Sequence, residues 1–460
     1  MSRLIGELSQ AGDAAILEPD HPDYPAATSG YQLGYRQEPD AVVLAAAPDD
    51  VRHAIRVATA AEARVTVQAT GHGLPGDRCG GVLVDTRRMN GVTVHPLART
   101  AVVQGGARWS DVIARAAVHG LAPLSGSAPS VGAVGYTLEG GVGLLSRQFG
   151  YAADHVLSLD IVTADGALRT ASPAEDPELY WALRGGGGNF GIVTAMTIAL
   201  FPVERFYGGG LYFADNDVER ILHGWAEWTA ELPPAMNSSI GLIPFPDRPT
   251  VPDPLRGRYA AHVRVAHLGT EEQAEELLAP LRALATPVLD TLRPMTYDEA
   301  ERIYDDPPTP MAYYATNVLV PALTPLDVDT VLAMTGPGST LPCVLQVNHL
   351  GGALAEAPAV PGAVAHRPQQ HAIRVLSRLA PAGGEGVVPA LREGHDALYR
   401  ALGVPDGELV LNFLLGGPVT TDQVRRGYHP EDFVALARLK HRYDPGNVFS
   451  GYHAVPPLAA

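Results

Sequence analysis

Cysteine is nearly absent from this chain. Only Cys79 and Cys343 occur among 460 residues, and they form neither a CxxC pair nor another metal-ligand spacing. So few thiols do not indicate a disulfide framework or an oxidising compartment. Lysine is scarcer still, because Lys440 is the only one and arginine carries the other positive charges. We attribute this scarcity to a GC-rich coding sequence rather than to chemistry.

Long apolar runs are absent too. No uncharged apolar run reaches the roughly 18 residues that a membrane-spanning helix needs, and residues 1–7 lack the apolar stretch of a signal peptide. The formal net charge of −17 argues against nucleic acid or an anionic membrane as a partner, because both are negatively charged. We therefore expect a cytoplasmic protein.

What is present is typical of a folded globular protein. Hydrophobic residues make up 46% and charged residues 18% of a chain long enough for two or three domains. The first 200 residues alternate short strands with helices. Helices are predicted at 48–63, 109–119 and 176–183, and strands at 64–70, 82–85, 101–104, 159–163, 167–170 and 191–200.

After Phe201-Pro202 the pattern changes to that of a second α+β domain on an antiparallel sheet. Helices are predicted at 216–231, 270–285 and 387–401, and strands at 257–265, 313–320, 343–349 and 408–415. A final helix at 431–443 and the turn 444–447 are expected to pack back on the first domain. The expected domain boundaries are therefore 1–204, 205–425 and 426–460.

Gly71-His72-Gly73 follows the predicted strand at 64–70. Glycine tolerates positive φ and lets main-chain N–H groups converge on an anion such as phosphate. A histidine between two such glycines also offers a nucleophilic imidazole nitrogen for covalent attachment of a cofactor. Taken alone, the motif is more often a histidine in a turn, so its meaning depends on the motifs that follow.

Two further motifs are rich in small residues. Residues 125–143 contain mostly glycine, serine and alanine, which lets a backbone lie along a long ligand, although a surface loop is the alternative. In residues 184–191, Gly186, Gly188 and Gly191 match GxGxxG. A Rossmann fingerprint needs a strand before it and a helix after it, whereas here a helix precedes and a strand follows. These glycines therefore favour close approach to a cofactor or a neighbouring loop.

The Gly-His-Gly motif, the small-residue loop, the glycine-rich turn and the terminal Asp444-Pro445-Gly446-Asn447 occur in this order. In this combination the chain resembles the berberine-bridge-enzyme-like flavin oxidases of the vanillyl-alcohol-oxidase superfamily. The resemblance covers nearly the whole chain and is strongest over 40–200 and 430–453. It implies an α+β fold, with a two-part PCMH-type FAD-binding domain and a substrate domain whose antiparallel sheet is covered by helices.

The resemblance also implies FAD bonded to His72 through the flavin 8α-methyl carbon. Many relatives attach FAD a second time, to a cysteine where this chain has Ala128, so we predict attachment through His72 only; Cys79 is expected to be a small buried residue. The residues that the resemblance places on FAD are Ala69, Thr70, Gly71, His72, Gly73, Leu74, Ser127, Ala128, Val131, Gly135, Tyr136, Gly141, Val193 and Asn447.

Two more positions depart from the family pattern. A tyrosine that often serves as a catalytic base is replaced by Val410. Glu139 stands where relatives have a glycine, on the oxygen-accessible side of the flavin, so reactivity with O2 does not follow from the resemblance alone.

Candidate catalytic residues come from the alternation of the predicted strands, which puts Asn412 toward the flavin and Gln346 beside Asn348 on one face. We expect Asn412 and Tyr136 near the flavin, and Gln346, Asn348 and Tyr314 as substrate contacts. A polar residue that is merely solvated is the alternative for each. His349 and His366 are possible bases, although a lone histidine is more often structural. We expect no metal site.

These features predict an FAD-dependent oxidoreductase that oxidises a small organic molecule, expected to be a specialised metabolite, by hydride transfer to flavin N5 with reoxidation by O2. Two alternatives stay open. One is a flavin dehydrogenase that uses another electron acceptor, and the other is a ligand-binding protein of the same fold without redox turnover.

Overall fold

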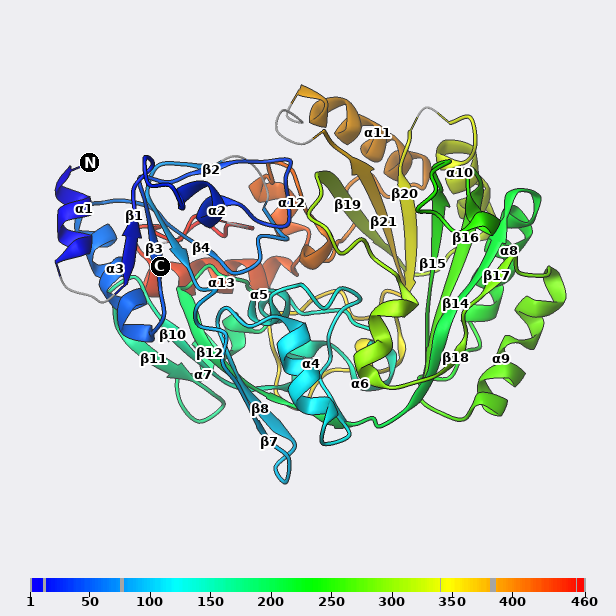
Figure 1. The fold of residues 1–460 in the computed structure, drawn as a ribbon, viewed down its shortest axis with the longest axis horizontal. Coiled ribbons are helices and arrows are strands. Elements are labelled where there is room, and N and C mark those ends of the chain that lie inside the picture. Colours follow the sequence, from blue (N-terminus) through cyan, green and yellow to red (C-terminus); the bar gives the residue numbers. More distant parts are fainter. Residues whose placement is uncertain are drawn as a thin grey trace.

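The computed structural model describes residues 2–10, 14–74, 78–339, 341–380, 386–451 and 453–458. Figure 1 shows two halves side by side. One half holds the first part of the chain (blue to green) together with the C-terminal segment (red), and the other holds the middle of the chain (green to orange). None of the described helices combines the length and apolar character needed to span a membrane.

The first half contains two sheets. One has the strand order β1 (Ala15–Leu17), β3 (Ala41–Leu44), β6 (Val82–Asp85) and β4 (Val65–Gln68). Strands β3, β6 and β4 are parallel, so their C-terminal ends meet at one edge. Helix α1 (Ser2–Ser9) and helix α3 (Pro48–Ala60) pack on this sheet, α3 through Val51, Ile55 and Ala58 as its helical spacing predicts. The loop that carries Gly71-His72-Gly73 leaves from the C-terminal edge.

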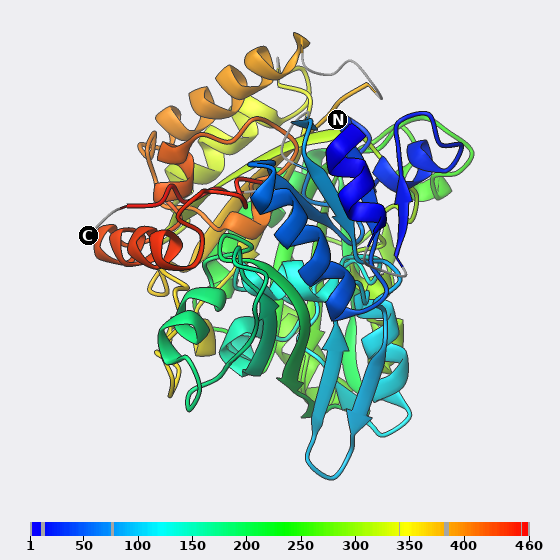
Figure 2. The same cartoon turned by 90° about the vertical axis from the view of Figure 1, so that its left-hand side faces the viewer.

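The second sheet of this half is antiparallel. Its order is β11 (Leu168–Ala171), β10 (Val156–Val162), β12 (Ile192–Ala199), β8 (Thr100–Gln104) and β7 (Val92–His95). Its core includes side chains from α4 (Trp109–Ala117), α5 (Ala133–Leu138), α7 (Pro177–Leu183) and α13 (Pro430–Tyr443). The β7–β8 hairpin projects from the molecule (Figure 1 and Figure 2), and Leu97 at its tip is fully exposed.

The other half is one large antiparallel sheet with helices on its outer face. Its strands run in the order β17 (Leu289–Asp290), β14 (Phe206–Ala214), β16 (Tyr259–His267), β15 (Met236–Pro244), β20 (Val344–His349), β21 (His371–Arg378) and β19 (Tyr313–Val320), with β18 (Arg293–Met295) beside β14. The helices are α8 (Val218–Thr229), α9 (Glu271–Leu284), α10 (Pro325–Thr335) and α11 (Val388–Ala401). Their apolar residues form one core with the outer face of the sheet, which leaves the inner face toward the first half.

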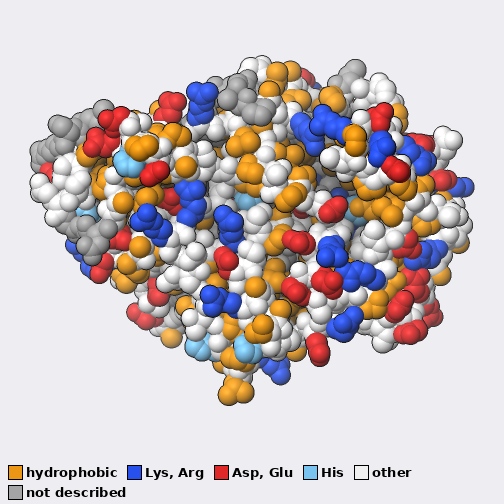
Figure 3. All heavy atoms as spheres, in the orientation of Figure 1, with side chains coloured by type: hydrophobic (Ala, Val, Ile, Leu, Met, Phe, Trp, Pro, Cys, Tyr) orange, Lys and Arg blue, Asp and Glu red, His pale blue; other side chains and the backbone are white. Residues whose placement is uncertain are grey.

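Short elements connect these layers. They are helices α2 (Tyr24–Thr28), α6 (Ser146–Phe149) and α12 (Thr421–Arg425), the 3₁₀ segments η4 (Tyr297–Ile303) and η7 (Leu411–Phe413), and the strand pairs β2 (Gln37–Glu38) with β5 (Arg78–Cys79) and β9 (Leu121–Ala122) with β13 (Phe201–Pro202). Acidic and basic side chains mix over the face in Figure 3, with acidic groups gathered near α9.

The predicted fold class is confirmed, but one predicted strand is wrong. Residues 408–415 form η7 and a single bridge between Ala315 and Leu415 rather than a strand. The Asn317 side chain bonds both backbone groups of Val410, at 2.9 Å to its carbonyl and 2.8 Å from its N–H. This side-chain amide satisfies the backbone where a neighbouring strand would otherwise do so. Leu409, Leu411 and Leu414 join the core of the first half, so the chain returns there before residue 426.

The only lysine holds the C-terminal segment in place. Lys440 is fully buried, and its Nζ donates to Asp444 Oδ2 at 2.5 Å, Asn189 O at 2.8 Å and Phe449 O at 2.7 Å. Asp444 in turn accepts the N–H groups of Val448 and Phe449. Burial lowers the pKa of Lys440, while Asp444 raises it. The ion pair therefore joins α13, the glycine-rich turn and the tail.

Lys440→Ala is expected to lower the free energy of unfolding by about 3–5 kcal/mol, because it leaves the buried Asp444 carboxylate unpaired. Arg442→Ala is the matched control on the same helix, since Arg442 pairs with Glu178 at the surface and is expected to cost about 0–1 kcal/mol. Urea unfolding of both variants measures the difference. Equal losses in the two variants would contradict the role of Lys440.

Candidate functional site

One large cavity lies between the two halves, with a volume of about 1020 Å³. One wall consists of loops from the first half, at 65–73, 126–144 and 188–193. The opposite wall is the inner face of the large sheet, from β14, β15, β16, β20 and β21. Sites of this kind, at a boundary between two structural units, commonly bind small molecules and cofactors.

His72 lies on the cavity wall in a defined environment. Its Nδ1 is 2.9 Å from Thr70 Oγ1 and its Nε2 is 3.2 Å from Ser130 Oγ. Tyr31 stacks on the ring at 4.0 Å between centroids, and the Tyr313 hydroxyl donates to the His72 carbonyl at 2.7 Å. Burial and then the charge of Arg108 lower the pKa of His72 to about 4. The imidazole is therefore neutral at pH 7.

The backbone under His72 requires glycine. Gly71 has a φ of +66°, and a Cβ there would lie 2.6 Å from Gly30 Cα. The Gly30 segment runs beside this loop, with Tyr31 N donating to Thr70 O at 2.9 Å and Gln32 N to Gly71 O at 3.0 Å. Close contact of two glycine backbones thus sets the direction in which His72 leaves the strand. The sequence pattern gave no indication of this partner segment.

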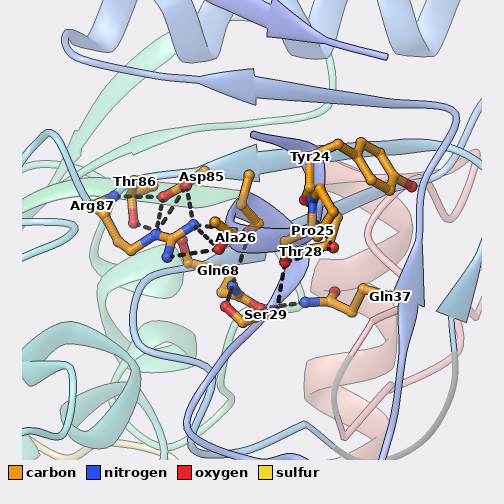
Figure 4. A network of polar contacts seen from close by, with 11 residues as sticks. Tyr24, Pro25, Ala26, Thr28, Ser29, Gln37, Gln68, Asp85, Thr86 and Arg87 are labelled. Carbon is orange, nitrogen blue, oxygen red and sulfur yellow. Dashed lines mark hydrogen bonds and ion pairs between the residues drawn. The ribbon is translucent and has the colours of Figure 1, made fainter. Parts of the chain in front are cut away.

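Figure 4 shows the polar network around Gln68, the last residue of β4 before this loop. The Gln68 side chain donates to Ser29 O at 2.9 Å and accepts from the Gln37 amide. Asp85, at the end of β6, holds the Arg87 guanidinium through a fork of hydrogen bonds, and Arg87 Nη2 also donates to Ala27 O at 2.9 Å. The network ties α2 to the ends of two parallel strands and so fixes the start of the His72 loop.

Most residues expected on FAD line the cavity: Ala69, Thr70, Gly71, His72, Gly73, Ser127, Ala128, Val131, Gly135, Tyr136 and Val193. Three lie elsewhere. Leu74 is buried in the protein, Gly141 packs under the Tyr136 ring, and Asn447 takes a φ of +50° in the turn after α13. The tail instead reaches the cavity through Phe449, Gly451 and His453, which sequence reasoning missed.

Of the three residues expected to contact the substrate, two line the cavity and one does not. Gln346 and Asn348 line the cavity, with Gln346 Nε2 donating to Asn348 Oδ1 at 3.2 Å. Tyr314 does not line it: its ring stacks on His395 and packs with Tyr35 on the opposite face of the sheet. Tyr313 takes the cavity position instead. Tyr314 was therefore the wrong choice of the two neighbouring tyrosines. Every residue of β19 is buried, so the alternation of residue types in the sequence does not distinguish the face toward the cavity from the other face.

Asn412 lines the cavity, but both ends of its amide bind backbone. Its Oδ1 accepts from Gly141 N at 2.8 Å and its Nδ2 donates to Tyr136 O at 2.9 Å. It therefore holds the end of α5 against η7. Tyr136 itself has a buried hydroxyl without a hydrogen-bond partner among the described residues. Burial, followed by Tyr297 and Tyr304, raises its pKa well above the usual value, so the phenol is a neutral donor at the cavity.

The two possible histidine bases are structural in their contacts. His349 is buried, and its Nε2 is 2.9 Å from Arg147 Nη1. Burial, Arg147 and His371 together lower the pKa of His349 to about 2. His366 bonds Arg426 O at 3.0 Å and lies 3.0 Å from Glu408. Neither residue lines the cavity.

Cys79 was expected to be buried but is exposed, whereas Cys343 is buried. Cys343 also lines the cavity, and burial raises its pKa to about 12, so it carries no thiolate at pH 7. Outside the cavity, Glu219, His223 and Asp329 place potential ligand atoms within 4.8 Å of one another on α8 and α10, a group that the sequence did not reveal.

The cavity wall suits a long planar cofactor. Gly135 and Gly188 both line it, and a Cβ on either would meet no protein atom within 4 Å. These glycines therefore keep space free in the cavity rather than making room for a neighbouring chain segment. Together with the main-chain groups at Ala69–Gly73 and the neutral His72, the residues present fit FAD.

Comparison with known proteins agrees with this geometry. Residues 39–172 match the model of the FAD binding domain family. (R)-6-hydroxynicotine oxidase of Paenarthrobacter nicotinovorans is 29% identical over 99% of both chains. The chain belongs to the PCMH-type FAD-linked oxidase superfamily. It is an FAD-binding oxidoreductase of the vanillyl-alcohol-oxidase and berberine-bridge-enzyme-like group.

Other members of the superfamily show the same relation. An FAD-linked oxidoreductase of Bacillus subtilis, YgaK, is 26% identical over 96% of this chain and 97% of its own. The crystal structure of 6-hydroxy-D-nicotine oxidase from Arthrobacter nicotinovorans superposes with a TM-score of 0.83 at 26% identity, over 97% of this chain and 99% of the other. FAD-linked relatives thus match both halves of this protein, and favour an enzyme over a binding protein that has lost turnover.

Glu139, which departs from the family pattern, has a partner. Its Oε1 lies 2.6 Å from His453 Nδ1, and His453 Nε2 is 3.0 Å from Leu414 O. Burial lowers the pKa of His453, but the Glu139 carboxylate and the two hydrogen bonds raise it by more than burial lowers it. The net shift of the pKa is therefore upward. With an acceptor at each nitrogen, the protonated ring can donate to both and so join the tail to the end of α5.

This pair predicts a pH dependence of stability. Because the pKa of His453 is raised in the folded protein, its stabilisation is present below about pH 6.5 and is lost as the pH rises through the folded pKa. Glu139→Gln is expected to lose less stability as the pH rises, which would be seen as a smaller slope of the melting temperature against pH. Glu393→Gln, which removes an exposed partner of Arg400, is expected to leave the slope unchanged. A wild-type slope retained in Glu139→Gln would contradict the assignment.

Proposed function

We propose that FAD is bonded to this protein through His72 alone, and that the flavin oxidises a small organic specialised metabolite with O2 as the final acceptor. The observation that carries the proposal is the neutral, oriented His72 imidazole on the cavity wall, with a pKa near 4. A neutral imidazole has a free electron pair on one nitrogen, which bond formation to a flavin carbon requires.

The absence of a cysteinyl link follows from Ala128. This residue lines the same wall as His72 and has no nucleophilic group. Cys343 also lines the cavity, but on β20's side and as a neutral thiol. Single attachment through histidine is therefore the arrangement that the available side chains support.

When bound, FAD supplies the hydride acceptor, flavin N5, and the route for electrons to O2. The chain's own residues position both reactants. Asn412 fixes the backbone at Tyr136 and Gly141, and Tyr313 fixes the His72 carbonyl. Gln346 and Asn348 present amides from the opposite wall, where they orient the substrate. The relative named for 6-hydroxynicotine, itself a small organic compound, supports a small metabolite as the substrate.

His72→Ala is expected to release nearly all the flavin into the supernatant after acid precipitation, and to abolish flavin fluorescence on a denaturing gel. Cys79→Ser and Cys343→Ser are the matched controls, and both are expected to keep the pigment with the protein. Flavin that stays attached in His72→Ala would exclude the histidyl bond. Colourless wild-type protein that FAD cannot reconstitute would exclude the whole proposal.

Reoxidation by O2 has its own test. Candidate metabolites are mixed with the protein without oxygen, and bleaching of the flavin identifies a substrate. On admission of air we expect the yellow colour to return with release of about one H2O2 per substrate oxidised. Recolouring only by an added dye, without peroxide, would identify a dehydrogenase instead.

A further inference from the structure

The wall formed by the large sheet carries arginines in an otherwise acidic protein. Arg264 on β16 and Arg374 on β21 line the cavity, as does the exposed Arg378 at the end of β21. Arg264 and Arg374 lie on the inner face of the sheet with Gln346 and Asn348, because Arg374 is paired with Gln346 in the ladder and Ser239 is paired with both Arg264 and Asn348. The chain as a whole has a net charge of −17, so a cationic wall is a local feature.

Arg264 is held by contacts that do not neutralise it. Its Nε donates to His262 Nδ1 at 3.2 Å, and its guanidinium lies 4.3 Å from the centre of the Tyr304 ring. Gly241 leaves it room, since a Cβ there would be 2.8 Å from Nη2. Arg264 itself is 5% exposed, and its Nη1 is buried with no hydrogen-bond partner among the described residues. A buried donor without an acceptor is costly unless something binds it.

Arg374 is placed in a similar way. Its guanidinium stacks 3.8 Å from the centre of the Phe413 ring, and Nη1 donates to Gln346 Oε1 at a long 3.4 Å. Burial lowers the pKa of Arg374, and the charge of Arg264 lowers it further, whereas Tyr304 and Asp306 raise it. The two guanidinium groups therefore repel each other electrostatically along the same wall.

No carboxylate compensates either arginine at contact distance. Within the described ranges, neither guanidinium has an Asp or Glu oxygen within 4.0 Å. Asp306 is the acidic group that acts on Arg374, and its Oδ2 is already bonded by Ser127 Oγ at 2.6 Å. Neither guanidinium therefore forms an ion pair with a carboxylate of the described residues, which leaves both cations available to an anionic group in the cavity.

We propose that Arg264 and Arg374 bind a carboxylate group of the substrate. This inference rests on the proposed function, because it takes the sheet side of the cavity as the substrate side. A carboxylate offers two acceptor oxygens in the plane of a guanidinium, which matches the unpartnered Nη1 of Arg264 and the weakly bonded Nη1 of Arg374. Tyr304 and Phe413, whose rings lie against the two guanidinium groups, provide surface for an aromatic body attached to that carboxylate.

Isothermal titration calorimetry on the flavin-loaded protein tests the proposal without turnover. The probes are benzoate, phenylacetate and 3-phenylpropanoate, each compared with its neutral amide, and phenyl phosphate. At least one acid is expected to bind about tenfold or more tightly than its amide, because a charge-assisted hydrogen bond is lost with the amide. Arg264→Gln and Arg374→Gln are each expected to remove most of this difference, and Arg374→Lys to restore part of it.

The control is Arg220→Gln, an exposed arginine on α8 paired with Asp217, which should leave both affinities unchanged. Melting temperatures separate binding from folding. Removal of an unpaired buried cation is expected to leave the melting temperature equal or higher, whereas a purely structural arginine would lower it and leave the acid-to-amide ratio intact.

The proposal is overturned if no acid binds more tightly than its amide, or if the glutamine variants keep the preference. Tighter binding of phenyl phosphate than of every carboxylate would overturn the carboxylate assignment. Failure of the proposed function is seen separately, in the flavin release of His72→Ala and the peroxide assay, and neither result changes the calorimetric comparison.

Discussion

The buried ion pair between Lys440 and Asp444 is the contact on which the assembled cavity depends. Lys440 donates to Asn189 in the glycine-rich turn and to Phe449 in the tail. Asn189 then bonds His453 O and Val455 N. The glycine-rich turn is thereby fixed to α13 and the tail, which lie far from it in the sequence, and both the turn and the tail supply cavity-lining residues. Because both charges are fully buried, each depends on the other to offset its lost hydration.

The two walls of the cavity differ in the physical means by which they bind. The first wall is made of loops whose small residues expose main-chain N–H groups, and it carries one nucleophilic side chain, His72. The second wall is a rigid sheet whose side chains carry the polarity. Glycines on the first wall allow backbone to approach a cofactor, while glycines on the second, such as Gly241, make room for a guanidinium. The same residue type thus serves opposite purposes on the two sides.

Sequence reasoning was strongest where one physical rule determined the structure. Gln346 and Asn348 were placed correctly because the period-two pattern of β20 has an apolar face and a polar face. The rule did not apply to β19, which is buried throughout, or to residues 408–415, where Asn317 replaces a strand partner. β14 was not predicted because Gly208-Gly209-Gly210 weakens strand propensity. Gly209 is required by a segment distant in sequence, since its φ is +138° and a Cβ on it would lie 2.4 Å from Thr291 O.

The burial of the single lysine also determines how the protein can be handled chemically. No lysine ε-amino group reaches solvent, so reagents that acylate or cross-link surface lysines have no lysine to modify. Its surface cations are arginines, whose guanidinium groups stay protonated and are poor nucleophiles. The exposed thiol of Cys79 offers the side-chain handle for a dye or a support.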